Sequence, residues 1–154
     1  TNSYKKHRQQ RRLISSLPKD AVYCLFTSGT SGRPKGVVVE HQGLVKRIQW
    51  FQDQYPLKLG ERVLCKTPYV FGISEWELFW PLTQGATLVM ASPDGHKDPD
   101  HLMRLIKEHR ISMTFFVPSM LAALLHAIQD EDDSSFHHDL SCLRVMFTCG
   151  EALS

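Results

Sequence analysis

The most constraining feature of this chain is the alternation of short apolar, β-rich runs with stretches of helical periodicity. Between the runs, apolar side chains recur at helical spacing, as in Leu102, Leu105 and Ile106, and again in Leu121 and Leu124. Strands that are apolar throughout and are separated by helices are typical of a mostly parallel sheet covered on both faces. The predicted fold class is therefore α/β, a mostly parallel sheet flanked by helices. The runs that predict strands are 21–26, 36–40, 62–66, 86–90, 113–117 and 143–147.

The first two runs differ from the others because only a glycine-rich loop separates them. That loop is too short for a crossover helix, so the pair is predicted to form an antiparallel hairpin. In parallel sheets, ligands bind beyond the carboxyl ends of the strands. The segments beginning near Thr27, Thr67, Val117 and Thr148 are therefore the candidate functional loops. The acid-rich stretch 129–139 is expected to be a solvated excursion.

Length and charge limit the function classes. The 154 residues, 42% apolar, suffice for one domain or for a piece of a larger one. The net charge is +2, yet residues 1–17 carry five Lys and Arg and no acid, so the remainder is slightly acidic. Residues 1–19 are interpreted as a basic arm or linker, with nucleic-acid binding the weaker alternative. The sequence lacks an N-terminal Met and stops after an apolar run, so we expect truncation at both ends.

Cysteine and histidine positions indicate neither a metal site nor a disulfide framework. The four cysteines form no CxxC pair and have no histidine at ligand spacing, so reduced, buried thiols in the cytoplasm are expected. No apolar run has the roughly 18 residues that a membrane helix needs. Surface loops are expected to hold His96, His101, His137 and His138.

The stretch 27–36 reads Thr-Ser-Gly-Thr-Ser-Gly-Arg-Pro-Lys-Gly. Glycines permit close backbone approach to an anion, hydroxyls donate hydrogen bonds, and Arg33 and Lys35 add positive charge. A Walker loop is excluded, because Gly36 follows Lys35 and a β-rich run follows Gly36 where that motif opens a helix. Composition alone leaves two alternatives: a phosphate-binding loop or an ordinary flexible turn.

The order of these residues resembles the signature loop of adenylate-forming enzymes, the family of acyl-CoA synthetases, luciferases and the adenylation domains of nonribosomal peptide synthetases. In that family the loop holds the β- and γ-phosphates of ATP. The resemblance implies that Lys35 stabilises the leaving pyrophosphate. The phosphate-binding residues that it implies are Thr27, Ser28, Gly29, Thr30, Ser31, Gly32 and Lys35.

Two further stretches support the resemblance. Residues 66–82 resemble the second core motif of peptide-synthetase adenylation domains, and residues 150–154 resemble the turn that lines the adenine, formed by Gly150, Glu151 and Ala152. The motif favours the synthetase branch over acyl-CoA ligases. The resemblance covers about residues 20–154, which are expected to be a partial adenylation domain truncated at its C-terminal end, within the large N-terminal domain of such an enzyme.

The resemblance also implies an acid pocket with one departure from the pattern. Amino-acid-activating members place Asp after the motif's first Phe, where its carboxylate pairs with the substrate's ammonium, whereas this chain has Gly72. A buried ammonium without a counter-charge is costly, so a hydroxy, keto or other non-amino acid is expected. A counter-charge from elsewhere and an inactive copy remain alternatives. The expected wall residues, which could instead be core, are Phe71, Gly72, Ile73, Trp76, Phe115, Phe147 and Cys149.

The chemistry that the resemblance implies is ATP-dependent formation of an acyl-adenylate with Mg²⁺, followed by transfer to the thiol of a carrier protein's phosphopantetheine or of CoA. The remainder of the adenylation domain is expected to supply the other catalytic elements, so these residues alone should not turn over. Glu75 and Glu77 lie two positions apart and are not expected to act as a pair. His41 is expected to orient the following helix. The alternatives are an acyl-CoA synthetase and a non-catalytic nucleotide-binding fragment.

Overall fold

The computed structural model describes residues 15–29, 32–130 and 140–152. Most of the expected basic arm, the phosphate-loop residues Thr30 and Ser31, and the excursion at 131–139 with His137 and His138 lie outside the described residues. The chain divides into two compact units, Thr1–Lys46 and Arg47–Ser154, and each is described by itself.

The first unit contains the predicted hairpin. Strands β1 (Ala21–Thr27) and β2 (Lys35–Glu40) pair antiparallel, with Thr27 opposite Lys35 and Cys24 opposite Val38. Helix α1 (His41–Gln54) follows β2 directly, and the backbone N–H of His41 donates to the carbonyl of Asp20 at 3.0 Å. The short glycine-rich loop therefore joins β1 and β2 in an antiparallel hairpin, which confirms the prediction for the first two runs.

The second unit is built on a parallel sheet with strand order β4-β3-β5-β6. The prediction of an α/β fold is confirmed, and the predicted strand ends differ from the observed ones by at most two residues. The strands are β3 (Arg62–Cys65), β4 (Thr87–Met90), β5 (Met113–Phe116) and β6 (Val145–Thr148). The connections contain α2 (Ser74–Thr83), the 3₁₀ turn η2 (Gly95–Lys97), α3 (Pro99–Glu108), α4 (Pro118–Asp130) and the 3₁₀ turn η3 (Leu140–Cys142).

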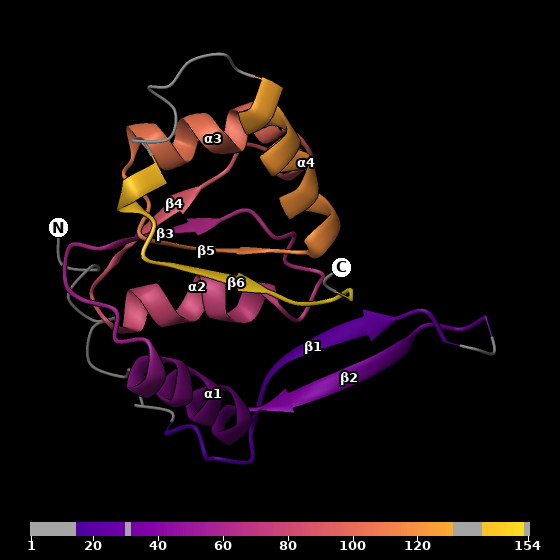
Figure 1. Cartoon of the computed structure of the whole chain (residues 1–154). Coiled ribbons are helices and arrows are strands. Elements are labelled where there is room, and N and C mark those ends of the chain that lie inside the picture. Colours follow the sequence, from indigo (N-terminus) through magenta and orange to yellow (C-terminus); the bar gives the residue numbers. More distant parts are fainter. Residues whose placement is uncertain (1–14, 30–31, 131–139, 153–154) are drawn as a thin grey trace, which may run out of the picture. The chain divides into compact units, whose positions relative to one another are not determined.

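Helices cover both faces of this sheet, with α2 on one side and α3 and α4 on the other (Figure 1). Successive strand residues point to opposite faces. Leu64 and Phe116 pack in the cluster of α3 and α4, whereas their neighbours Val63 and Phe115 pack in the cluster of α2. The central strands β3, from Val63 onward, and β5 are therefore buried on both faces, whereas β4 and β6 are only partly buried.

The helix starts on the α3 and α4 side follow from local sequence. The Asp98 side chain accepts a hydrogen bond from the backbone N–H of His101 at 3.1 Å, and Pro99 occupies the first turn of α3. Pro118 begins α4, as its fixed φ angle favours. These starts bring the segments after β4 and β5 to the carboxyl edge of the sheet.

Candidate functional site

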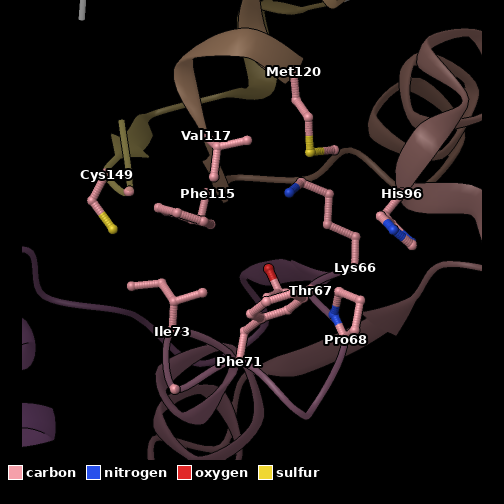
Figure 2. Close-up of a pocket in the computed structure, with 12 residues that line it drawn as sticks. Lys66, Thr67, Pro68, Phe71, Ile73, His96, Phe115, Val117, Met120 and Cys149 are labelled. Carbon is pink, nitrogen blue, oxygen red and sulfur yellow. The ribbon is translucent and has the colours of Figure 1, made fainter. Parts of the chain in front are cut away.

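A cavity of about 490 Å³ lies at the carboxyl edge of the parallel sheet (Figure 2). Its wall combines segments that follow β3, β4, β5 and β6 with the turn that begins α2, so chain segments far apart in sequence meet there. This is where ligands bind in open parallel sheets. The lining residues are Lys66, Thr67, Pro68, Phe71, Gly72, Ile73, His96, Phe115, Val117, Met120, Cys149 and Gly150.

Five of the seven residues expected in the acid pocket meet in this wall: Phe71, Gly72, Ile73, Phe115 and Cys149. Gly150, expected at the adenine turn, joins them. The motif after β3 therefore comes together with the segments after β5 and β6. The three-dimensional juxtaposition matches the resemblance, and the binding roles of these residues stay predictions.

Trp76 and Phe147 differ from this expectation, because the structure places both rings in the aromatic core and not in the cavity wall. Trp76 is 1% exposed; its ring lies 5.6 Å from that of Phe51 and 5.2 Å from that of Phe147. Trp80, fully buried beside them, donates from Nε1 to the Gln52 side chain at 2.8 Å. Large aromatic rings bury the most apolar area when they pack between a helix and a sheet, and the rings of Trp76 and Phe147 lie in such a place.

Sequence reasoning missed several lining residues, among them Lys66, His96 and Met120. Lys66 is the residue directly after β3, and His96 lies in η2 after β4, so their positions after two parallel strands were a usable signal. The expectation of a surface loop is also wrong for His101, which lies in the first turn of α3. Its ring accepts or donates a hydrogen bond with the Ser92 hydroxyl at 3.1 Å.

A buried carboxylate organises the turn after β3. Glu77 is 0% exposed, and its Oε2 accepts the backbone N–H groups of Lys66 and Thr67 at 3.1 and 2.9 Å. Its Oε1 accepts the Thr67 hydroxyl at 2.9 Å. Burial raises the pKa of Glu77, while the hydrogen bonds of Thr67 and the charge of Lys66 act in the opposite direction. The carboxylate thus fixes the backbone that carries two of the lining residues.

Glu75 and Glu77 serve different partners, as their spacing predicts. Glu75, 5% exposed, pairs with Arg47 of α1, and burial raises the pKa of its carboxyl. Glu77 faces the turn after β3. The two carboxylates therefore do not form an acid–base pair.

The turn expected to line adenine is tied to the start of α4. Gly150 has a φ of +96°, a conformation that glycine adopts without strain. The carboxylate of Glu151 accepts the backbone N–H and the hydroxyl of Ser119, both at 2.9 Å. A second cavity, of about 290 Å³, lies here, and its lining includes Pro118, Ser119, Glu151 and Ala152. Glu151 therefore orients this turn through its side chain.

The phosphate loop belongs to the first unit. Its described part begins at Thr27, where β1 ends, and ends at Lys35, where β2 begins. A side chain at Gly29 would lie 2.0 Å from the carbonyl oxygen of Arg33, and Gly32 has a φ of +76°. The glycines therefore permit a tight return that other residues would strain. Lys35 is exposed at the start of β2.

The cysteines differ in exposure. Cys24 and Cys149 are exposed and Cys65 is buried, so the expectation of buried thiols is wrong for the first two, which lie on the hairpin and beyond β6. Burial raises the pKa of Cys65 to about 12, and the nearby Glu77 charge acts in the same direction.

We expect iodoacetamide at pH 8 to alkylate Cys149 and Cys24 well before Cys65, because the thiolate is the reactive form. Peptide mass spectrometry of a labelling time course measures the order. Since Cys149 lines the cavity, a bound acid should slow its labelling and leave Cys24, in the other unit, unchanged. Labelling of native Cys65 as fast as Cys149 would contradict the burial of β3.

The family comparison agrees with this geometry. A sequence model described as "AMP-binding enzyme" matches residues 2–154. The chain belongs to this family.

Relatives of this AMP-binding chain include large synthetases. It is 46% identical over 146 residues to vanchrobactin synthetase VabF of Vibrio anguillarum, covering 95% of this chain and 5% of VabF. It is 42% identical over 138 residues to enterobactin synthase component F of Escherichia coli, covering 90% of this chain and 10% of that protein. The chain therefore spans a small fraction of the length of the curated relatives it matches.

A solved structure has the same fold. The nonribosomal peptide synthetase FmoA3, crystallised with α-methyl-L-serine-AMP, superposes with a TM-score of 0.78 at 28% sequence identity, covering 89% of this chain and 15% of FmoA3. The AMP-binding chain is thus similar to part of a nonribosomal peptide synthetase in both sequence and structure.

Metal-ligand clusters and membrane-spanning helices are both absent from the described part of this AMP-binding chain. Residues 15–29, 32–130 and 140–152 contain no group of three or more His, Cys, Asp or Glu that could hold a metal ion. None of the helices in this part of the chain has the length and apolar character needed to span a bilayer.

Proposed function

We propose that this chain is part of an enzyme that activates a carboxylic acid with ATP, forming an acyl-adenylate and releasing pyrophosphate. One observation carries the proposal: the apolar cavity and the expected adenine turn share Gly150. An acid in the cavity and an adenine at the turn would then be neighbours, as an acyl-adenylate requires. Residues 20–154 would form part of an adenylation domain.

In the proposed reaction, a carboxylate oxygen of the acid attacks the α-phosphorus of ATP. A new O–P bond forms, the bond from the α-phosphorus to the bridging oxygen breaks, and pyrophosphate leaves with the electron pair. Lys35 and the hydroxyls and N–H groups of the loop at 27–32 would neutralise the charge that develops on the leaving group. The walls around Phe71 and Phe115 would hold the acid in place.

Mg²⁺, carried by the ATP phosphates, would supply further charge neutralisation. The described residues hold no cluster of ligands for the ion. We therefore assign none of them to it, and the steps assigned to this chain depend on Lys35, the loop donors and the cavity wall.

The acceptor of the acyl group is proposed to be the phosphopantetheine thiol of a carrier domain, because the similar proteins are named vanchrobactin synthetase, enterobactin synthase and nonribosomal peptide synthetase. CoA is the alternative acceptor. The FmoA3 structure holds an aminoacyl-AMP, which supports adenylate formation as the shared chemistry. We place the activity in the cytoplasm, where ATP and reduced thiols are available.

The substrate is proposed to be a non-amino acid with an apolar side chain. Gly72 lies in the cavity wall and offers no carboxylate, and none of the described lining residues is acidic. An α-ammonium would be desolvated there without a counter-charge, which is costly. Phe71, Ile73 and Phe115 offer apolar area to the side chain of the acid. Together with the missing counter-charge, this favours hydroxy, keto or aryl acids.

ATP–pyrophosphate exchange on the complete gene product that contains these residues tests the activity. The panel contains α-amino, α-hydroxy, α-keto and aryl acids. Exchange that depends on an added acid supports acyl-adenylate formation. If a folded protein that binds ATP shows no exchange with any acid of the panel, the non-catalytic nucleotide-binding alternative is supported instead.

The substrate preference is tested with three acids of matched shape: phenylpyruvate, phenyllactate and phenylalanine. We expect exchange with the keto or hydroxy acid to exceed exchange with phenylalanine. Gly72→Asp adds the missing carboxylate and should shift the ratio towards phenylalanine by roughly 10- to 100-fold. Gly72→Asn, of equal size and without charge, is the matched control. A wild-type preference for phenylalanine would overturn the assignment of a non-amino substrate.

A further inference from the structure

Lys66 brings a positive charge into the cavity wall. Lys66 as a residue is 7% exposed. The ammonium nitrogen lies 4.5 Å from the ring centre of Phe116 and 5.4 Å from that of Phe115. Figure 2 shows the end of the side chain directed into the cavity, towards Phe115 and Met120.

The ammonium has no hydrogen-bond acceptor or ion-pair partner among the described residues. Glu77 is the nearby acid, and its charge acts on the pKa of Lys66. Its two oxygens are taken by the backbone N–H groups of Lys66 and Thr67 and by the Thr67 hydroxyl, however. Glu77 is also 0% exposed and is not part of the cavity wall. The Lys66 ammonium therefore retains three donors that no oxygen of the described residues accepts.

The protein itself supplies no oxygen acceptor to this cation among its described residues. A desolvated cation loses hydration that only a hydrogen-bonded partner restores in full. Aromatic faces attract a cation but accept its protons weakly. In line with this cost, burial lowers the pKa of Lys66, although Glu77 acts in the opposite direction. A negatively charged oxygen of a ligand would accept hydrogen bonds from the ammonium and would also balance its charge.

The rest of the wall favours the same class of ligand. No acidic side chain lines the cavity in the described part of the chain, so no charge in the wall repels an anion. His96, the other nitrogen-bearing side chain of the lining, also offers no negative charge. The wall around Lys66 is otherwise largely apolar, and a low-polarity surrounding strengthens a charge pair.

We propose that Lys66 binds an oxyanion of the ligand in this cavity, a second cationic contact in addition to that of Lys35. The inference rests on the proposed function, which supplies two oxyanions: the carboxylate of the acid and the α-phosphate of the nucleotide. Both present the same chemistry to an ammonium, namely a charged oxygen that accepts its hydrogen bonds. Lys66, the first residue of the 66–82 motif, is thereby a substrate-contacting residue to which the sequence analysis assigned no role.

The test uses two pairs of probes that differ in charge, namely benzoate with benzamide, and AMP with adenosine. Binding to the complete gene product is measured by calorimetry for wild type, Lys66→Met and Lys66→Arg. Methionine preserves the long apolar stem without the charge, and arginine preserves the charge. Lys58→Met is the matched control at an exposed position, and thermal unfolding reports whether each variant is folded.

We expect Lys66→Met to weaken the binding of benzoate, of AMP or of both by at least about tenfold. The affinities for benzamide and adenosine should stay within about twofold of those of wild type. Lys66→Arg should recover part of the loss. Loss for benzoate alone identifies the acid's carboxylate as the ligand, and loss for AMP alone identifies the phosphate. Equal changes for charged and neutral probes, no change, or failure of the wild type to bind either anion would overturn the proposal.

The outcome is separable from that of the proposed function. If acid-dependent pyrophosphate exchange is absent while anion binding still requires Lys66, the enzyme assignment fails and the anion site stands. If exchange is present and Lys66→Met leaves anion binding unchanged, the reverse holds.

Discussion

Lys35→Ala is expected to reduce acid-dependent ATP–pyrophosphate exchange by roughly 100- to 1,000-fold, the scale of removing one charge-stabilising donor from a reaction centre. The reason is the proposed contact of the Lys35 ammonium with the leaving pyrophosphate. Lys35 is exposed at the first position of β2, and the loop that precedes it contains Gly29 and Gly32 in a tight return. The substitution removes charge from a surface side chain and should leave the fold unchanged. Exchange kinetics of the complete gene product give the measurement.

Two controls sharpen this result. Lys35→Arg retains the positive charge and should recover part of the exchange rate, whereas Lys58→Ala removes an exposed lysine elsewhere and should leave the rate near that of wild type. If Lys35→Ala exchanges as fast as Lys58→Ala, the loop has no phosphate role in this protein.

Glu77→Ala is expected to lower the free energy of unfolding by about 3–5 kcal/mol. The change leaves the backbone N–H groups of Lys66 and Thr67 and the Thr67 hydroxyl without their acceptor. It also removes the carboxylate whose charge partly offsets the burial of Lys66. Urea unfolding at neutral pH measures the difference, with an unchanged m-value as the sign that only stability has altered.

The double variant Glu77→Ala with Lys66→Met tests the cause. Since it removes both charges together, it should be more stable than Glu77→Ala alone. Glu108→Ala, an exposed acid in the last turn of α3, is the matched control and should stay within about 0.5 kcal/mol of wild type. A loss below about 1 kcal/mol for Glu77→Ala would mean that water replaces the carboxylate in the turn after β3.

Much of the fold follows from local sequence. The glycine-rich loop at 27–36 excluded a crossover and predicted the hairpin of β1 and β2, which the pairing confirms. The apolar runs predicted a parallel sheet, and Pro118 indicated the start of α4. Loop length and the fixed φ of proline act between residues close in sequence. Burial of parallel strands on both faces is a tertiary effect, but it leaves a local signal in the form of apolar runs.

The candidate site was predictable in part. Order and spacing of the motifs identified Phe71, Gly72, Ile73, Phe115 and Cys149, which the fold brings into one cavity wall. The same resemblance placed Trp76 and Phe147 there, whereas Trp76 is buried in the core and Phe147, partly buried, packs against it. A motif specifies which residue types occur along the chain, whereas the contact between α2 and the sheet decides which rings reach the cavity.

The sequence by itself determined the α/β class, the hairpin, the loop residues that resemble a phosphate site and the membership of the AMP-binding enzyme family. Only the tertiary structure decided that Lys66 is directed into the cavity, that Glu77 supports the turn beneath it, and that Phe115 and Phe116 face opposite layers. The physical reason is that β5 is a central strand, buried at every position on both faces. Its sequence therefore carries no alternation from which to read which face each side chain takes, and packing against α2, α3 and α4 sets that choice.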